Sequence, residues 1–386
     1  MIKILNYSTV KPQEIFARPK GITDVSAIVS DIIRTVRLNG DKALKEYCKE
    51  FDGADLQSLE VGEEEISAAI RSTEPEFLRV LKQAAANIKR FHLKQKRKGF
   101  TVSKKDGTIV GQKITPIEKA GIYVPGGTAV YPSTVLMDAI PAKIAGVKEI
   151  IMTTPPDKNG NINPAVLAAA KIAGVDRIFK AGGAQAIAAL AFGTESIPAV
   201  NKIVGPGNAF VAEAKKQVFG KVAIDMIAGP SEILIVADGK SNATFIAADL
   251  LSQAEHDKMA SAVLITDSET LALKVRAEIE RQSELLPRKE IARASIDDNG
   301  KIIVADSIAQ AIEISNEIAP EHLELCLDEP FKYLDKVVNA GSVFLGRYCP
   351  EALGDYFAGT NHTLPTLGTA KFSRPLSVDD FIKKTQ

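Results

Sequence analysis

Residues 142–147 read Ala-Lys-Ile-Ala-Gly-Val, and residues 170–175 repeat the same six residues. Each copy ends an alanine-rich helical stretch with glycine and leads into a β-branched run, residues 149–153 after the first copy and 177–180 after the second. Glycine at a helix end permits the left-handed turn that reverses the chain. The two copies are therefore successive helix–turn–strand units of one sheet, since a repeat that occurs only twice does not form a solenoid.

The same alternation extends outward from this repeat in both directions. Further strands are expected at residues 121–124, 202–204, 233–236, 262–266, 301–304 and 342–345, and helices begin near Ser133, Asn163, Ala184 and Asn208 and cover residues 243–255, 269–281 and 307–319. Before them, residues 25–51 and 63–98 have helical spacing, interrupted at Pro75. Alternating strands and helices predict an α/β protein with parallel sheets.

We expect two Rossmann-like, doubly wound parallel-sheet domains, one inserted in the other, with short N- and C-terminal extensions. The expected bounds are 1–20 for the N-terminal extension, 21–120 with 233–376 for a discontinuous first domain, 121–232 for the inserted domain and 377–386 for the stub of a C-terminal extension. Ligands of such folds normally bind in sheet clefts.

Composition excludes several classes of protein. The 48 basic and 48 acidic residues balance, so no general attraction to nucleic acid or anionic membrane is expected. No run approaches the ~18 apolar residues that a membrane-spanning helix needs, and the N-terminus does not resemble a signal peptide. Cys48, Cys326 and Cys349 are few and lack CxxC spacing, which favours the reducing cytoplasm and small buried side chains.

Three glycine-rich turns follow expected strands. Residues 124–127 read Val-Pro-Gly-Gly, residues 181–185 Ala-Gly-Gly-Ala-Gln and residues 204–208 Val-Gly-Pro-Gly-Asn. Glycine lets a ligand approach the backbone, and the free N–H groups of a following helix start can hold phosphate oxygens. A tight turn needs glycine anyway, but three such turns at successive strand ends favour a dinucleotide or phosphate ligand.

The histidines indicate where chemistry occurs. Gln253 and His256 are three residues apart, which on a helix places an amide oxygen and an imidazole on one face. Such ligands suit zinc, with a third donor from elsewhere; exposed polar groups at a helix end are the alternative. His92 stands in a basic amphipathic helix and is interpreted as structural or surface-exposed.

Two further clusters lie toward the C-terminus. Glu321 and His322 are adjacent, and because adjacent residues on a helix diverge, one could relay protons while the other activates water; a chance pair is the alternative. Asp355 and His362 lie in a long polar segment, residues 351–366, that resembles the lining of a site. Asp355 is a candidate oxygen ligand for the metal.

At these residues the sequence resembles the histidinol dehydrogenase family, over nearly its whole length through Arg374-Pro375. The matching stretches are residues 121–147, 181–196, 205–215, 228–232, 250–256, 319–322 and 340–366. The resemblance implies the following roles: NAD contacts for Tyr123, Gln185 and Asn208, substrate contacts for Ser231, His322 and His362, zinc ligation for Gln253, His256 and Asp355, and proton transfer for Glu321 and His322. The zinc holds the substrate's amine and imidazole, so its three ligands also form part of the substrate site.

The implied reaction oxidises L-histidinol to L-histidine in two NAD-dependent steps, the last of histidine biosynthesis. His322 takes the hydroxyl proton as hydride leaves, giving histidinal; Glu321 then activates water to form the hydrate, which loses the second hydride. The resemblance also implies a homodimer. Family members continue beyond the position of Gln386 into a tail whose Glu and His reach the neighbouring active site, so weaker metal binding and reduced activity are expected for this chain.

Other functions fit part of the pattern. A dehydrogenase of a polyol or sulfonated diol would retain the NAD turns, zinc ligands and Glu-His pair. A non-catalytic NAD- or metal-binding relative would bind both groups without forming NADH. A zinc hydrolase would use Glu321 on water but leaves the glycine-rich turns unexplained.

Overall fold

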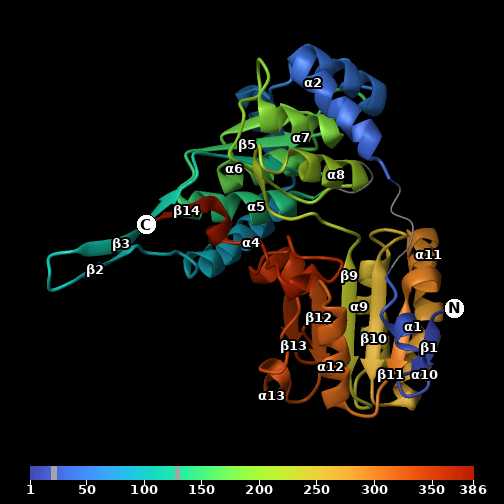
Figure 1. Ribbon diagram of the computed structural model, residues 1–386. Coiled ribbons are helices and arrows are strands. Elements are labelled where there is room, and N and C mark those ends of the chain that lie inside the picture. Colours follow the sequence, from blue (N-terminus) through green and yellow to red (C-terminus); the bar gives the residue numbers. More distant parts are fainter. Residues whose placement is uncertain (19–23, 127–130) are drawn as a thin grey trace. The chain divides into compact units, whose positions relative to one another are not determined.

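The computed structural model describes residues 1–18, 24–126 and 131–386. The chain forms two units, each with its own parallel sheet (Figure 1). Unit 1 comprises residues 1–22, 228–354 and 364–375, and unit 2 comprises residues 23–227, 355–363 and 376–386. Gly127, part of the first expected glycine-rich turn, lies outside the described residues, as does the boundary expected at residues 20 and 21.

Unit 1 is built on a six-stranded parallel sheet. In spatial order its strands are β1 (Lys3–Asn6), β11 (Lys301–Val304), β10 (Ser261–Thr266), β9 (Glu232–Ala237), β12 (His322–Cys326) and β13 (Ser342–Leu345). Its helices are α1 (Pro12–Ile15), α9 (Ala243–Ala254), α10 (Glu269–Ser283), α11 (Lys289–Asn299), α12 (Ile308–Ile318), α13 (Phe331–Leu334) and α14 (Glu351–Leu353).

Both faces of this sheet are covered, which explains the continuous apolar runs of its strands. Along β9, Ile233 and Ile235 pack into a cluster with α9, α10 and α11, whereas Leu234 and Val236 pack into a second cluster with α1 and α12. Successive side chains of a strand point to opposite faces, so one strand supplies both cores.

Unit 2 has a five-stranded parallel sheet. Its strands, in spatial order, are β6 (Arg177–Lys180), β5 (Glu149–Thr154), β4 (Lys119–Tyr123), β7 (Lys202–Val204) and β8 (Ala223–Ile224). Helices α2 (Ser26–Tyr47), α7 (Gly183–Phe192) and α8 (Ala209–Val218) cover one face, and α3 (Glu63–Ser72), α4 (Pro75–Leu93), α5 (Pro132–Ala145) and α6 (Pro164–Ala173) cover the other. A separate antiparallel sheet joins β2 (Phe100–Ser103), β3 (Ile109–Pro116) and β14 (Ile382–Thr385).

The two parallel sheets have the same topology. Counted along the chain from β4 and from β9, the spatial order in each is third, second, first, fourth, fifth, with β1 added at one edge of unit 1. The first strand therefore pairs with the fourth, β4 with β7 and β9 with β12. In doubly wound sheets this is the switch point, where ligands normally bind at the carboxyl ends of the strands.

The predicted fold class is confirmed, and strands β6, β7, β11 and β13 have the expected bounds. The helical interpretation of Glu321 and His322 is wrong, since His322 begins β12 and Glu321 immediately precedes it. The domain bounds also differ from the expected ones: helices α2, α3 and α4 belong to unit 2, with residues 355–363 and 376–386. The sequence pattern of an amphipathic helix shows that the helix has an apolar face, but it does not show which sheet that face covers.

In the described part of the chain, no helix combines the length and the apolar character needed to cross a membrane. The cysteines are unpaired; Cys48 and Cys326 are buried as expected, whereas Cys349 is partly exposed. His92 is fully buried, with Nδ1 2.7 Å from Gln95 Oε1, so it is structural and not a surface residue.

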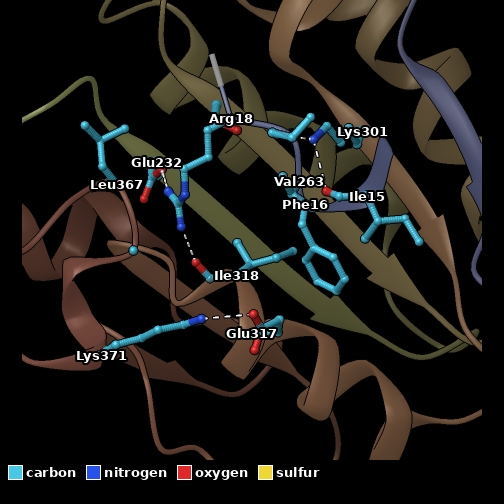
Figure 2. Close-up of a pocket in the computed structure, with 13 residues that line it drawn as sticks. Ile15, Phe16, Arg18, Glu232, Val263, Lys301, Glu317, Ile318, Leu367 and Lys371 are labelled. Carbon is cyan, nitrogen blue, oxygen red and sulfur yellow. Dashed lines mark hydrogen bonds and ion pairs between the residues drawn. The ribbon is translucent and has the colours of Figure 1, made fainter. Parts of the chain in front are cut away.

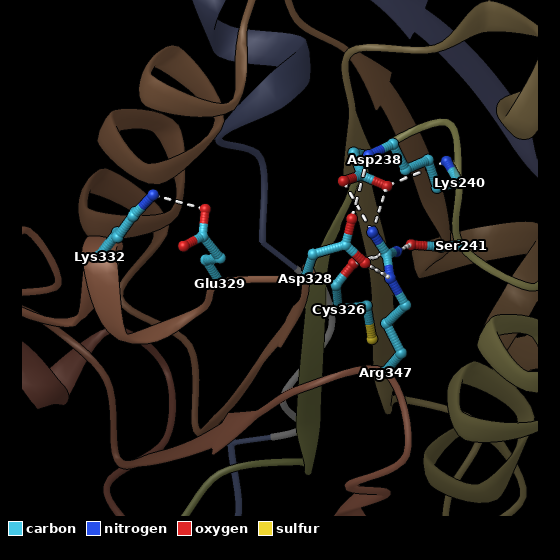
Figure 3. Close-up of polar contacts among 8 residues, drawn as sticks. All are labelled: Asp238, Lys240, Ser241, Cys326, Asp328, Glu329, Lys332 and Arg347. Atoms are coloured by element: carbon cyan, nitrogen blue, oxygen red, sulfur yellow. Dashed lines mark hydrogen bonds and ion pairs between the residues drawn. The ribbon is translucent and has the colours of Figure 1, made fainter.

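An arginine occupies the switch point of unit 1 at the carboxyl ends of its strands (Figure 3). Arg347, just beyond β13, donates to both carboxylate oxygens of Asp238 at 2.8 Å and to Asp328 Oδ1 at 2.8 Å. It also donates to the carbonyl of Cys326 at 2.9 Å and to Ser241 Oγ. One guanidinium thus joins the ends of β9, β12 and β13.

We predict that Arg347→Met lowers the free energy of unfolding of unit 1 by about 2 kcal/mol, because Asp238 keeps its charge in a partly buried place without its partner. Lys240→Met is the matched control: Lys240 contacts the same cluster through Asp328 at 3.1 Å, but its side chain is 77% exposed. Urea unfolding followed by circular dichroism measures both. Equal shifts for the two variants would contradict the role of Arg347.

Candidate active site

In unit 2 the expected nucleotide turns meet at the carboxyl ends of β4, β6 and β7. Tyr123 closes β4, is 4% exposed, and its hydroxyl accepts the N–H of Gly183 at 3.1 Å. Gly183 has φ +61°, and a Cβ there would lie 2.7 Å from Gln185 Oε1, so the turn requires glycine. The first and second turns are therefore fixed to each other before any ligand binds.

The third turn begins a helix. Asn208 is exposed and caps α8, its Oδ1 accepting the N–H groups of Phe210 and Val211 at 3.1 Å. Gln185 is 3% exposed. Beside the first turn, a cavity of about 650 Å³ opens at the ends of β4 and β5, lined by Pro125, Gly126 and residues 154–157 together with α3 and α6. The structure thus places all three expected NAD residues at one edge of the sheet of unit 2.

In unit 1 the expected catalytic pair lies where β12 runs beside β9. Glu321 Oε2 accepts the backbone N–H of Glu232 at 2.9 Å, and His322 Nδ1 lies 3.0 Å from the carbonyl oxygen of Glu232. Glu321 is 7% exposed and His322 2%. Because a carbonyl can only accept, His322 Nδ1 carries a proton, and in the neutral imidazole Nε2 is therefore the basic nitrogen.

A carboxylate that the sequence analysis missed faces that nitrogen. Glu351 Oε1 lies 3.8 Å from His322 Nε2, and Glu351 is 2% exposed. Its Oε2 accepts Ser252 Oγ at 3.2 Å, and its backbone N–H donates to Glu324 Oε1 at 2.9 Å. Glu351 is thus held to stabilise positive charge on the imidazole.

Glu324, which is 1% exposed, forms a carboxyl pair with the partly buried Asp249. Burial, and then the charge of Asp249, raises the pKa of Glu324 well above its usual value. Burial raises the pKa of Asp249 to about 6, against a smaller lowering by its hydrogen bond to Glu324. Two carboxyl groups that share a hydrogen bond in an apolar place retain a proton between them.

The expected zinc ligands of α9 and its C-terminal end lie at the same edge of the sheet. Gln253 is 1% exposed, and its Oε1 has no hydrogen-bond partner among the described residues. An orphaned buried oxygen of this kind is costly unless something binds it. His256 follows α9 and is partly buried. The chain then enters β10, where Ser261 N–H donates to the carbonyl of Ser231 at 2.9 Å.

Five expected residues therefore gather at the amino edge of the unit 1 sheet: Ser231, Gln253, His256, Glu321 and His322. Asp355 and His362 belong to the segment of unit 2 at residues 355–363. There His362 Nδ1 lies 3.0 Å from the carbonyl oxygen of Asp355, and His362 Nε2 lies 3.4 Å from Thr134 Oγ1.

The side chain of Glu232 forms an ion pair with Arg18 (Figure 2). Arg18 donates to Glu232 Oε1 at 2.5 Å and to the carbonyl of Ile318, beside a cavity of about 280 Å³. Burial raises the pKa of Glu232, and the charge of Arg18 opposes that effect. Lys301 donates to the carbonyls of Ile15 and Ala17 at 3.0 and 2.6 Å, which anchors the segment carrying Arg18.

A family match covers residues 17–386 and is described as histidinol dehydrogenase. The chain belongs to the histidinol dehydrogenase family. A histidinol dehydrogenase of Clostridium acetobutylicum is 58% identical, over 94% of this chain and 84% of that protein, and one of Geobacillus kaustophilus is 55% identical, over 95% and 86%. The crystal structure of histidinol dehydrogenase from Elizabethkingia anophelis matches with a TM-score of 0.95 and 44% identity, covering 100% of this chain and 89% of that one.

The family makes this chain an oxidoreductase of histidine biosynthesis. A more distant likeness, to an acetylating aldehyde dehydrogenase of Geobacillus thermoglucosidasius, has a TM-score of 0.51 and 14% identity and concerns the fold alone.

The carboxyl pair near His322 generates a pH prediction. The unfolded Asp249 carboxyl loses its proton near its usual pKa of 3.8, whereas the folded one holds it to about pH 6. This contribution to the free energy of unfolding is complete below pH 3.8 and is lost as pH rises through about 6. We predict that Asp249→Asn flattens this decline, measured as the urea midpoint at a series of pH values.

Glu278→Gln is the matched control for Asp249→Asn. Hydrogen bonding to Arg281 lowers the pKa of Glu278, so the titration of Glu278 affects stability only around and below its usual value of 4.5. The prediction fails if the difference between the parent chain and Asp249→Asn does not change between pH 4 and about 6.

Proposed function

We propose that the chain is a zinc-dependent enzyme that oxidises L-histidinol through histidinal to L-histidine, with NAD accepting hydride in both steps. The observation that carries this proposal is the arrangement at the start of β12, where one backbone residue, Glu232, orients both Glu321 and His322. Relatives that are 55–59% identical and named histidinol dehydrogenase support the substrate.

The first step needs a base for the hydroxyl proton. We assign this role to His322, whose protonated Nδ1 leaves Nε2 as the basic nitrogen. Once His322 is protonated, the Glu351 carboxylate 3.8 Å from Nε2 stabilises the imidazolium. A base so positioned contributes about 10²–10⁴-fold to a rate.

The aldehyde then takes up water. Glu321 is assigned as the base that activates this water, and its bond to the Glu232 N–H at 2.9 Å holds one oxygen while leaving the carboxylate its remaining acceptor capacity. The hydrate is an alcohol again, so His322 can serve a second time once it has released the first proton to solvent. NAD would supply the hydride acceptor for each oxidation, one NAD per step, with NADH leaving in between.

NAD is assigned to the glycine-rich turns of unit 2, with contacts from Tyr123, Gln185 and Asn208. The support is that these turns lie together at the carboxyl ends of β4, β6 and β7, the usual location for a dinucleotide. A zinc ion is assigned to Gln253, His256 and Asp355, supported by the unpartnered Oε1 of Gln253. A zinc ion held by these residues would orient the substrate, and Ser231 and His362 are assigned to substrate contacts.

The proposed enzyme acts in the cytoplasm as a homodimer. Three unpaired cysteines are consistent with a reducing compartment. Light scattering of the purified chain measures the assembly directly, and a monomer that is fully active would contradict it.

We predict different products for two variants of the catalytic pair. His322→Asn loses about 10²–10⁴-fold in kcat for histidinol, because no base takes the first proton. Glu321→Gln keeps an acceptor for the Glu232 N–H but cannot activate water, so it releases histidinal and yields one NADH per histidinol instead of two. Absorbance of NADH and trapping of the aldehyde with semicarbazide measure the ratio.

Glu317→Gln is the control, since Glu317 is paired with Lys371 at 3.1 Å on the rim of the cavity in Figure 2. It should keep two NADH per histidinol. Turnover of simple diols in place of histidinol, or hydrolysis without NAD, would overturn the proposed reaction.

A second prediction concerns zinc. Gln253→Leu weakens zinc binding at least tenfold, because a ligand is lost, yet the metal-free variant is as stable as the metal-free parent, because Oε1 has no protein partner to lose. Calorimetric titration with zinc and thermal unfolding after chelation measure the two effects. Gln282→Leu on α10, whose amide donates to the carbonyl of Thr244 at 3.0 Å, is the control and leaves zinc affinity unchanged.

A further inference from the structure

Three ionisable side chains are buried beneath the third glycine-rich turn of unit 2. The side chains of Lys215 on α8 and Asp225 after β8 are 2% and 1% exposed and form an ion pair. Asp138 on α5 is fully buried. Removing charges from water costs several kcal/mol for each ion unless partners compensate. We therefore examine the contacts that these three side chains make.

Both members of the ion pair form hydrogen bonds with the backbone of one residue, Gly205. Asp225 Oδ2 accepts the N–H of Gly205 at 2.8 Å, and Lys215 Nζ donates to the carbonyl of Gly205 at 3.0 Å. Gly205 has φ +115°, and a Cβ there would lie 2.1 Å from the carbonyl oxygen of Tyr123. Only glycine fits at this position. Glycine is also the residue type with the greatest conformational freedom, so other residues must fix its backbone.

These hydrogen bonds to Gly205 lie at the switch point of the sheet. Gly205 follows β7 where β7 pairs with β4, and the next three residues lead into α8, whose first N–H groups Asn208 caps. Fixing both polar groups of Gly205 therefore fixes the direction in which the turn leaves the sheet and presents the start of α8.

Asp138 connects the same turn to a second segment. One of its carboxyl oxygens, Oδ1, accepts Thr363 Oγ1 at 3.0 Å. The other, Oδ2, lies 3.1 Å from the place a Cβ on Gly205 would take and has no hydrogen-bond partner among the described residues. Burial, and then the charge of Asp225, raises the pKa of Asp138 well above its usual value, which favours the uncharged carboxyl group.

The segment that Asp138 holds contains His362. Along α5, Thr134 lies 3.4 Å from His362 Nε2, and the Met137 carbonyl accepts Asn361 Nδ2 at 2.7 Å. Residues 134, 137 and 138 of α5 thus contact residues 361–363. Of these three helix residues, Asp138 also faces Gly205.

We propose that Lys215 and Asp225 are positioning residues for the NAD-contacting turn, and that Asp138 couples this turn to the placement of His362. The inference rests on the roles proposed above for the turn and for His362. The alternative is that the cluster supports folding only, in which case its loss lowers stability and leaves ligand binding unchanged.

The test compares two ion pairs at opposite ends of β7. Lys215→Met with Asp225→Asn removes both charges together, so that neither remains buried alone. The control is Lys202→Met with Asp380→Asn, a pair at 3.0 Å whose side chains are each 12% exposed, at the amino end of the same strand. Fluorescence titration with NADH and calorimetry with NAD measure affinity on the purified full chain.

We expect the first double variant to bind NAD at least tenfold more weakly and the control to stay within about twofold, although both unfold at lower urea. Equal NAD affinity in the folded double variants would overturn the positioning role. Failure of the parent chain itself to bind NAD would instead refute the proposed function.

Asp138 supplies an independent test if the first double variant does not fold. Asp138→Val removes the bond to Thr363 and should raise KM for histidinol at least fivefold at saturating NAD. Asp138→Asn, which has nearly the same shape as Asp and keeps an acceptor for Thr363, should restore the parental KM. An unchanged KM in folded Asp138→Val would overturn the coupling, as would equal losses in both variants.

Discussion

The pairing of the first strand with the fourth is the constraint on which the site of unit 1 depends. His322 opposes Ile233 in the β9–β12 register, so the backbone of the preceding residue, Glu232, reaches both Glu321 and His322. A shift by one residue would turn each of these side chains to the opposite face of the sheet. The orientation of the imidazole and the carboxylate thus depends on the sheet register, because both contact the backbone of Glu232.

The same sheet topology carries candidate residues at different edges in the two units. Unit 2 has its glycine-rich turns at the carboxyl edge, as doubly wound sheets usually do. Unit 1 has Glu321, His322 and Gln253 at the amino edge, and its carboxyl edge is closed by Arg347, which is bound to Asp238, Asp328 and Ser241. The donors of this guanidinium are satisfied by carboxylates at the carboxyl edge, whereas the candidate residues of unit 1 lie at the opposite edge of the same sheet.

The sequence was sufficient for the fold class and for most strands, because short continuous apolar runs that alternate with helical stretches have few other solutions. The sequence analysis interpreted Glu321 and His322 as helical residues. The strand that begins at His322 has only five residues, all of them buried, and its polar first residue hides the usual apolar pattern of a buried strand. Glu351, Glu324 and Asp249 could not be predicted as a group. Their proximity depends on which strands are neighbours in the sheet, and a buried carboxyl looks the same in sequence as an exposed one.

The glycine-rich turns also show what the sequence alone cannot predict. Here the residues were recognised, but what fixes their conformation was not. Glycine is easy to recognise and correctly marked the turns, yet glycine only permits a left-handed conformation and does not select it, since it reaches many other conformations at similar energy. At Gly205 the selection comes from Asp225 and Lys215, 20 and 10 residues further along the chain. The permissive residue and the residues that specify its conformation are thus separate in sequence and meet only in the folded sheet. The motif alone therefore marks the turn but does not show what fixes its conformation.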